Sequence, residues 1–297
     1  MIKTPVVLFV YKRPKKTKQI LNQINRANVE RLFIVGDGPK KVSDQPKCEK
    51  VKDLILDNKF DFEVVSTFSD NNLGLKERFS TGLDWVFNTV DRAIILEDDT
   101  YPSIKFFHFC ECLLEHYDGD KRVWEITGTN HFNKWNNNPY DYHFSYQGSI
   151  WGWATWRESW IKYDKDMNLW GNKNVRIALE NVLCEEGLYE YAKRVYSKTY
   201  FGEIDTWDYQ WGFARQINNG LSVVPKVNLI DNIGIDDAST HGMKDNPLIP
   251  TEVYDIELPL KHPPYISPDR KYDKKVHNNR HKSMIYKIFN KIESYLS

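Results

Sequence analysis

The chain has 297 residues, and its 41 basic and 41 acidic side chains give a formal net charge of zero. This length is enough for one large or two small domains with a substantial core. The balanced charge excludes a general attraction to nucleic acid or anionic membranes, so any electrostatic function must be local. The four cysteines show neither CxxC spacing nor nearby histidines at the spacing of a zinc site, which indicates free thiols in a reducing cytoplasm.

The first 130 residues alternate short β-branched runs with amphipathic helical patterns, which predicts a mainly parallel sheet flanked by helices. The predicted strands are Val6–Tyr11, Leu32–Val35, Phe62–Thr67, Ala93–Leu96 and Val123–Thr127. The predicted helices are Thr17–Ile24, Lys47–Leu56, Leu75–Val90 and Ile104–Tyr117. Sheets of this kind bind ligands at the carboxyl ends of their strands, so we expect the site in the loops after the strands.

The regular alternation stops after about residue 130, and seven of the ten tryptophans fall between Trp124 and Trp170. Aromatic rings stack on the apolar faces of sugars, so this segment is a candidate sugar-binding wall. Core packing explains many of these rings equally well, and we expect roughly half of them in the core. Further along, Ile177–Tyr196 and TWDYQWGFARQINNG predict helices, the second ended by Gly220, and Ser222–Pro225 predicts a strand.

Six prolines from Pro247 onward predict an extended wrap rather than a helix. From Arg270 the tail carries eight basic and two acidic residues and ends in an amphipathic pattern, SMIYKIFNKIESYLS. Two interpretations of residues 270–297 stay open: a peripheral contact with an anionic membrane, or docking on the domain.

Three consecutive carboxylates, Glu97, Asp98 and Asp99, directly follow the fourth predicted strand. Hard oxygen ligands suit Mg²⁺ or Mn²⁺, which proteins usually hold with one or two carboxylates plus substrate phosphates. The alternative is a solvated loop in which Asp99 or Thr100 caps the next helix, with a proline at its start. The acidic run therefore predicts a metal site only if the neighbouring loops support it.

The neighbouring loops supply suitable groups. Lys12 and Arg13 put positive charge where a pyrophosphate would lie, and Asp37 stands between two glycines, where it can accept a hydrogen bond from a base or ribose. Each also fits an ordinary loop or turn. The chain contains neither GxGxxG after the first strand nor GxxxxGK[ST], which disfavours a dinucleotide dehydrogenase and a P-loop nucleotidase.

Seven segments occur in the order PVVLFVYKRP, GDGP, NLGLKERFSTGLDWVF, AIILEDDTYPSIKFF, GSIWGWATW, TWDYQW and NIGIDDASTHG. Together they resemble GT-A-fold glycosyltransferases, in particular the family of N-acetylglucosaminyltransferase I and its bacterial relatives, over roughly residues 5–242. The resemblance implies a Rossmann-like GT-A domain over 1–246, with a nucleotide-binding half at 1–130 and an acceptor half at 131–246. Residues 247–297 then form the wrap and basic tail.

The resemblance also implies an activity. It is the metal-dependent, inverting transfer of a sugar from a nucleoside-diphosphate donor, expected to be a UDP-sugar, to a hydroxyl of a glycan or lipid-linked acceptor. The expected setting is bacterial surface polysaccharide or lipopolysaccharide synthesis, with Mn²⁺ or Mg²⁺ as cofactor and no nucleic-acid partner. Because the eukaryotic members carry an N-terminal membrane anchor and this chain starts at the first strand, we expect a cytoplasmic enzyme, either free or peripheral at the inner face of the plasma membrane.

Carried over by position, the resemblance makes Asp99 the metal ligand and places Asp98 near the donor ribose or sugar. It assigns Arg13 and Asp37 to the nucleotide. Its base is the aspartate of a WD pair at the start of a helix, which matches Asp208 here. Independently, inversion at a sugar carbon needs one carboxylate to take the proton of the acceptor hydroxyl.

Other assignments are less specific. Lys76 and Trp153 are assigned to the nucleotide-sugar site, and His241 matches a histidine in a family loop that closes over the donor. Glu203 and Asp205 are near enough in sequence to be the base in place of Asp208. Two other functions stay open: a sugar-phosphate nucleotidyltransferase, whose glycine-rich basic signature is absent, and a non-catalytic carbohydrate-binding protein.

Overall fold

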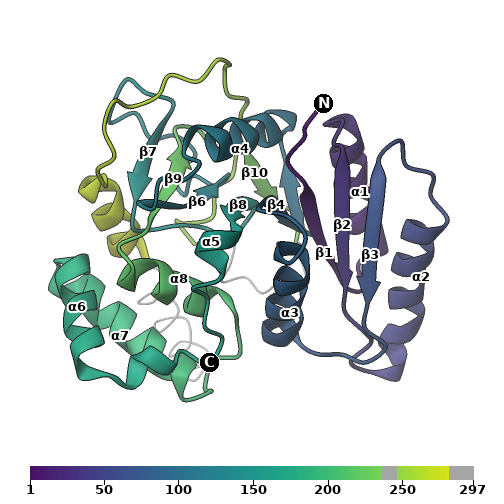
Figure 1. The fold of residues 1–297 in the computed structure, drawn as a ribbon, viewed down its shortest axis with the longest axis horizontal. Coiled ribbons are helices and arrows are strands. Elements are labelled where there is room, and N and C mark those ends of the chain that lie inside the picture. The colour runs from purple at the N-terminus through teal and green to yellow at the C-terminus, as the bar shows by residue number, and fades with distance from the viewer. Residues whose placement is uncertain (236–245, 281–297) are drawn as a thin grey trace, which may run out of the picture.

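A computed structural model describes residues 1–235 and 246–280. Its centre is an eight-stranded sheet of order β3-β2-β1-β4-β8-β6-β9-β7 (Figure 1). The pairs β1–β2, β2–β3, β1–β4 and β6–β9 are parallel, whereas β8 and β7 run antiparallel to their neighbours. The strands are β1 (Val6–Val10), β2 (Arg31–Gly36), β3 (Glu63–Phe68), β4 (Arg92–Glu97), β6 (Val123–Thr127), β7 (Tyr142–Ser145), β8 (Trp153–Trp156) and β9 (Leu221–Pro225).

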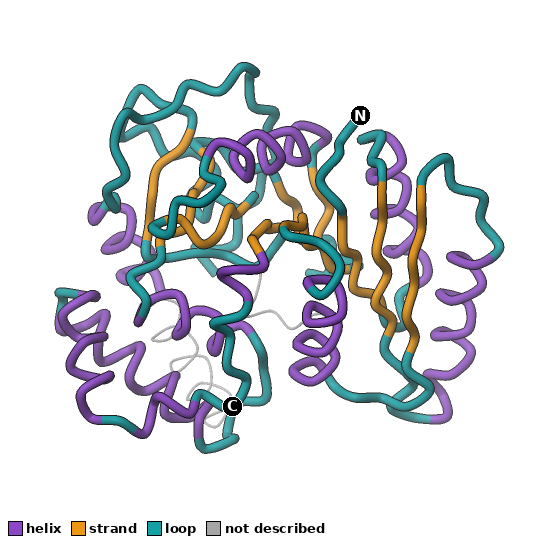
Figure 2. The backbone as a smooth tube through the Cα atoms, viewed as in Figure 1, coloured by secondary structure: helices purple, strands orange, loops and turns teal. Residues whose placement is uncertain are grey.

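The helices are α1 (Pro14–Arg26), α2 (Gln45–Leu56), α3 (Leu75–Phe87), α4 (Ile104–His116), α5 (Arg157–Trp160), α6 (Lys173–Leu183), α7 (Glu186–Tyr200) and α8 (Asp208–Ile217), with 3₁₀ turns η1 (Val42–Asp44) and η2 (Asn168–Gly171). Helices lie on both faces of the sheet, whereas α6 and α7 pack against α8 (Figure 2). The predicted class, α/β with a mainly parallel sheet flanked by helices, is confirmed.

Alternation along β1 shows how the sequence builds the two faces. Val6, Leu8 and Val10 pack into a core with α1, α2 and α4, whereas Val7 and Phe9 pack with α3, α5 and α8 on the opposite face. Successive side chains of a strand point to opposite faces, so a strand buried on both sides reads as a continuous apolar run. The uninterrupted run VVLFV is therefore the signature of a central strand.

The half after residue 130 differs from the prediction in detail. Strands β7 and β8 lie where no strand was predicted, and the expected helix Ile177–Tyr196 is two helices, α6 and α7. Cys184 separates them with a φ of 58°, a left-handed conformation that ends a helix. Helix α8 ends at Ile217, and Asn219, not Gly220, takes the left-handed conformation after it. Asparagine tolerates that region better than most residues, which the sequence reading overlooked.

Residues 247–267 contain neither helix nor strand, in agreement with the prediction that the prolines exclude a helix. Helical residues 270–280 follow, and they were not predicted. Buried Asp273 fastens this helix to β7, since the Ser145 hydroxyl donates to its carboxylate at 2.5 Å. The terminal segment 283–297, on which the membrane interpretation depends, lies outside the described residues. Among the helices that are described, none is long and apolar enough to cross a membrane.

Candidate active site

The three carboxylates after β4 lie beside the loop that follows β1. The two strands are parallel neighbours with Phe9 opposite Glu97, so their carboxyl ends meet at one edge. Arg13 occupies the residue before α1, and its Nη1 donates to Asp98 Oδ1 at 2.8 Å and to Asp99 Oδ2 at 2.7 Å. The Asp98 side chain is 6% exposed and that of Asp99 is 17% exposed. The structure thus brings together three of the predicted residues, with Asp99 the more accessible carboxylate.

Glu97 is held in a turn and surrounded by negative charge. Its backbone N–H donates to the Thr100 hydroxyl at 2.9 Å, and that hydroxyl donates to the Glu97 carbonyl at 3.0 Å. Burial, followed by the charges of Asp99, Asp98 and Asp208, raises the pKa of Glu97 to about 8. Burial also raises the pKa of Asp98, against the opposing effect of Arg13. These carboxylates therefore form an electrostatically strained cluster that a bound cation would relieve.

A second segment passes closely over Asp99. The small sheet pairs β5 (Thr100–Pro102) with β10 (Ile230–Asn232), and the Ile233 N–H donates to the Asp99 carbonyl at 2.9 Å. A Cβ on Gly234 would lie 2.4 Å from Asp99 Oδ2 and 2.8 Å from Asn232 Oδ1, so a larger residue here would displace the Asp99 carboxylate or the Asn232 amide. Asn232 and Gly234 are site residues that the sequence reading did not single out. Their sequence signal was residues 232–234, whose contact with Asp99 depends on the pairing of β5 with β10.

A column of aromatic rings fixes Asp208 relative to this cluster. Phe9 of β1 stacks on Phe79 of α3 at 3.9 Å between ring centroids, and Phe79 stacks on Trp207 at 3.7 Å. Trp153 of β8 continues the column 5.6 Å from Trp207. Because Trp207 directly precedes Asp208, the stack ties the start of α8 to the end of β1. Close-packed rings of this size leave little freedom for the residue that follows them.

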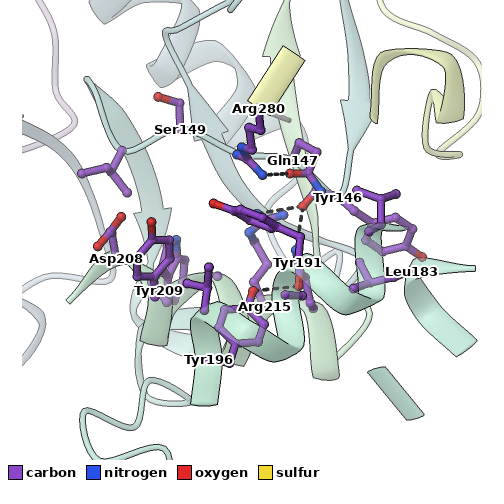
Figure 3. Close-up of a pocket in the computed structure, with 18 of the residues that line it drawn as sticks. Tyr146, Gln147, Ser149, Leu183, Tyr191, Tyr196, Asp208, Tyr209, Arg215 and Arg280 are labelled. Carbon is purple, nitrogen blue, oxygen red and sulfur yellow. Dashed lines mark hydrogen bonds between the residues drawn. The ribbon is translucent and has the colours of Figure 1, made fainter. Parts of the chain in front are cut away.

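Asp208 lies partly exposed at the first position of α8, where the Thr206 hydroxyl donates to its carboxylate. It is close enough to raise the pKa of Tyr163 and Tyr209, in each case after the larger effect of burial. Glu203 and Asp205 are exposed instead, and Glu203 pairs with Lys198 at 3.5 Å. Of these three carboxylates, Asp208 alone lines the cavity of Figure 3.

Other predicted residues are placed apart from the carboxylate cluster. Asp37 uses both carboxylate oxygens within its own loops, accepting from the N–H groups of Gly38, Leu73 and Gly74 and from the Asn72 amide at 2.8 to 3.1 Å. It thereby fixes the loop before α3 and borders a cavity of about 170 Å³ beyond β1 and β2.

Lys76, Trp153 and His241 are the remaining residues that the sequence assigned to the nucleotide-sugar site. Lys76 Nζ lies 3.7 Å from Asp166. Trp153 is 1% exposed, so its ring supports the site from within the core and presents no face to a sugar. In the same segment Trp151 is partly exposed. His241 lies outside the described residues.

The residues present fit a hard divalent cation of the kind predicted. Within residues 1–235 and 246–280, no three His, Cys, Asp or Glu side chains form a metal-binding group. Mg²⁺ and Mn²⁺ do not require such a cage when substrate phosphates complete the coordination. Asp99, which pairs with Arg13, is the carboxylate that would hold the ion, and the amide oxygen of Asn232 lies on the same side, beside Gly234.

Comparisons with known proteins give limited information. No protein-family model matches the chain, and a search of curated proteins finds no match. Among solved structures, UDP-glucose pyrophosphorylase from Acinetobacter baumanii is 10% identical with a TM-score of 0.40, covering 79% of this chain and 89% of its own. Mouse xyloside xylosyltransferase 1 is 11% identical with a TM-score of 0.36, covering 72% and 81%.

A third structure, 4-diphosphocytidyl-2C-methyl-D-erythritol synthase from Anaerococcus prevotii, is 9% identical with a TM-score of 0.34, covering 64% of this chain and 84% of its own. Likeness this distant carries no weight on activity. The functional interpretation therefore rests on this chain's own residues, and membership of the N-acetylglucosaminyltransferase I family stays a prediction.

Proposed function

We propose that the protein is a metal-dependent, inverting glycosyltransferase that uses a nucleoside-diphosphate sugar, with UDP-sugars as the first candidates. The observation that carries this proposal is the contact of Arg13 with Asp98 and Asp99, with Asp208 within electrostatic reach of the same acidic run. The first three lie at the carboxyl ends of β1 and β4, and Asp208 is close enough to contribute to the raised pKa of Glu97. The first group suits binding of a diphosphate, and Asp208 suits the role of a separate carboxylate base.

Each residue has a role in the proposed reaction. Arg13 and Asp99 hold the diphosphate end of the donor, Asp99 through a divalent cation that would stabilise negative charge on the leaving phosphate. Asp98 lies next to Arg13 and faces the donor sugar or ribose. Asp37 fixes the loop beside the cavity beyond β1 and β2, which suits the nucleoside end.

In the transfer step Asp208 takes the proton of an acceptor hydroxyl as its oxygen attacks the anomeric carbon. The bond between that carbon and the phosphate oxygen breaks, and the nucleoside diphosphate leaves with the electron pair. Attack opposite the leaving group inverts the configuration. The proposed acceptors are glycans or lipid-linked sugars, and the proposed setting is surface polysaccharide or lipopolysaccharide synthesis. Mn²⁺ or Mg²⁺ is the proposed cofactor.

A panel of nucleotide sugars with and without Mn²⁺ tests this proposal. Release of UDP from a UDP-sugar only when metal is present is the expected result. Diphosphate release from UTP and a sugar phosphate would instead identify a nucleotidyltransferase. Sugar binding without either reaction would identify a non-catalytic binding protein, and both of these outcomes contradict the proposal.

A further inference from the structure

The cavity beside Asp208 is lined by side chains from distant parts of the chain. It has a volume of about 210 Å³ and lies between α7, α8 and the loop 146–150. A water molecule occupies about 30 Å³ of the liquid, so this space suits a single sugar ring better than a longer glycan. Four tyrosines contribute to its lining: Tyr146, Tyr191, Tyr196 and Tyr209. Tyrosine offers a flat apolar face with a polar tip, which matches the mixed surface of a sugar.

One charged pair in the lining is already balanced inside the protein. Glu125 accepts hydrogen bonds from Trp211 Nε1 at 2.6 Å and from the Ser222 hydroxyl at 2.7 Å. Arg215 Nε lies 3.8 Å from the Glu125 carboxylate, and an Arg215 Nη2 donates to the Tyr146 carbonyl at 3.1 Å. Both side chains are almost fully buried, so their charges compensate each other. Among the described residues, Arg215 Nε still lacks a hydrogen-bond partner.

Arg280 is the cation in this lining without such a balance. Its Nη1 donates to the neutral Gln147 amide oxygen at 2.6 Å, and its guanidinium lies 5.4 Å from the centre of the Tyr191 ring. None of the described carboxylates forms an ion pair with it. Burial and then the charge of Arg280 lower the pKa of His131 to about 4, so the histidine stays neutral and does not share the positive charge.

The arrangement has a negative end and a positive end. Figure 3 shows Arg280 beside Gln147 and above the Tyr191 ring, with Asp208 and Tyr209 at the left of the cavity. With a neutral acceptor, Arg280 would face the cavity without a counterion from residues 1–235 or 246–280. A guanidinium binds carboxylate and phosphate oxygens with charge-assisted hydrogen bonds, about twice as strong as neutral ones.

We infer that this cavity binds an acceptor sugar that carries an anionic group, with an acceptor hydroxyl at Asp208 and the anion at Arg280. This inference rests on the proposed function and specifies its acceptor. The tyrosine faces contact the ring, and the anion is either a carboxylate, as in a uronic acid, or a phosphate, as in a sugar 1-phosphate. Both anions present the same oxygens to Arg280.

Calorimetric binding to the full chain tests the inference with matched probes. The carboxylate pair is p-nitrophenyl β-D-glucuronide against p-nitrophenyl β-D-glucoside, and the phosphate pair is N-acetylglucosamine 1-phosphate against N-acetylglucosamine. At least one anionic member should bind roughly 10-fold or more tightly than its neutral partner, as expected for one hydrogen bond between charged groups. This preference should shrink as salt is raised.

Two variants in the same helix show whether the anionic preference comes from the cavity or from the general charge of the surface. Arg280→Gln should remove the anionic preference, whereas Lys271→Gln, which loses the same charge at an exposed position, should keep it. Arg280→Lys keeps the charge without the planar fork and should retain part of the preference. The inference is overturned if neither wild-type pair shows a preference, if the preference is insensitive to salt, or if Arg280→Gln retains it.

Failure of the inference is distinguishable from failure of the proposed function. Metal-dependent UDP release in water, without any anionic preference in binding, would overturn the anionic acceptor alone. An anionic preference without any use of nucleotide sugars would contradict the proposed function while supporting the anion-binding cavity.

Discussion

The carboxyl ends of β1 to β4 and the cavity beside α8 differ in how their polar groups are satisfied. At the strand ends, neighbouring loops satisfy each other: Arg13 binds Asp98 and Asp99, and Lys12 Nζ lies 2.9 Å from Asp44. In the cavity, Arg280 keeps an uncompensated charge and Arg215 Nε lacks a partner among the described residues. The first region is organised before any ligand arrives, whereas the second has bonding capacity left for one.

Substitutions in the two regions should therefore have different effects on binding and on stability. Substitutions at the strand ends remove groups that hold one another in place. They should therefore weaken donor binding and disturb the loops at the same time. Changes at Arg280, which forms no ion pair with a described carboxylate, should alter acceptor use with little cost in stability.

The largest expected effect is at the boundary between the two regions. Asp208→Asn should lower kcat for sugar transfer roughly 10²- to 10⁴-fold, because the amide cannot take the acceptor proton. Donor affinity should change little, as judged by KM for the nucleotide sugar. The matched controls are Asp205→Asn and Glu203→Gln at exposed positions. If either control abolishes transfer while Asp208→Asn retains it, the base is assigned to the wrong residue.

The aromatic column that joins the two regions should contribute mainly to stability. Phe79→Ala removes the central ring between Phe9 and Trp207 and should cost about 3 to 5 kcal/mol of unfolding free energy. It should also reduce kcat, because Trp207 no longer fixes Asp208. Urea denaturation measures the first effect, and Leu75→Ala, at a residue of the same helix that is 51% exposed, is the control with little expected change. Wild-type stability in Phe79→Ala would show that the column is not structurally important.

A smaller, pH-dependent effect is expected at the helix that carries Arg280. Burial raises the pKa of Asp273 from 3.8 to about 6, against hydrogen bonds from Ser145 and the charge of Arg270. Folding therefore favours the protonated form of Asp273. The contribution of this proton to the stability of the fold is complete below pH 3.8 and is lost as the pH rises through about 6. One pKa unit corresponds to about 1.4 kcal/mol, so this loss is about 3 kcal/mol.

Asp273→Asn replaces the carboxylate with a neutral group of the same shape. Its unfolding free energy relative to wild type should therefore rise by up to about 3 kcal/mol between pH 4 and pH 7. Denaturation curves at both pH values measure the change. A difference between variant and wild type that does not vary with pH would contradict the raised pKa.

The two regions also differ in how far the sequence predicts them. The strand ends were predictable because short apolar runs locate the strands, and parallel strands bring Arg13, Asp98 and Asp99 to one edge. The position of Asp208 was not, because it depends on ring stacking between α3 and the residue before α8. Trp153 illustrates the same limit: its sequence neighbourhood suggested a sugar-binding surface, whereas strand pairing with β4 and β6 buries it.

The cavity was missed because its lining comes from segments more than 100 residues apart. Gln147 and Arg280 meet only because the wrap brings helical residues 270–280 against β7. No local pattern marks Arg280 as different from the other basic residues of the tail. The split between α6 and α7 was hidden for a different reason, since Cys184 carries no composition signal for its left-handed conformation.

Metal binding in the presence of UDP tests the central claim most directly. Calorimetric titration of Mn²⁺ should show binding to the wild-type protein with UDP present, and Asp99→Asn should weaken it at least about 10-fold, since a carboxylate ligand is lost. Glu63→Gln, at an exposed carboxylate on β3, is the control and should bind as wild type does. If Asp99→Asn binds Mn²⁺ and UDP as tightly as the wild type, the carboxylates after β4 are not the metal site.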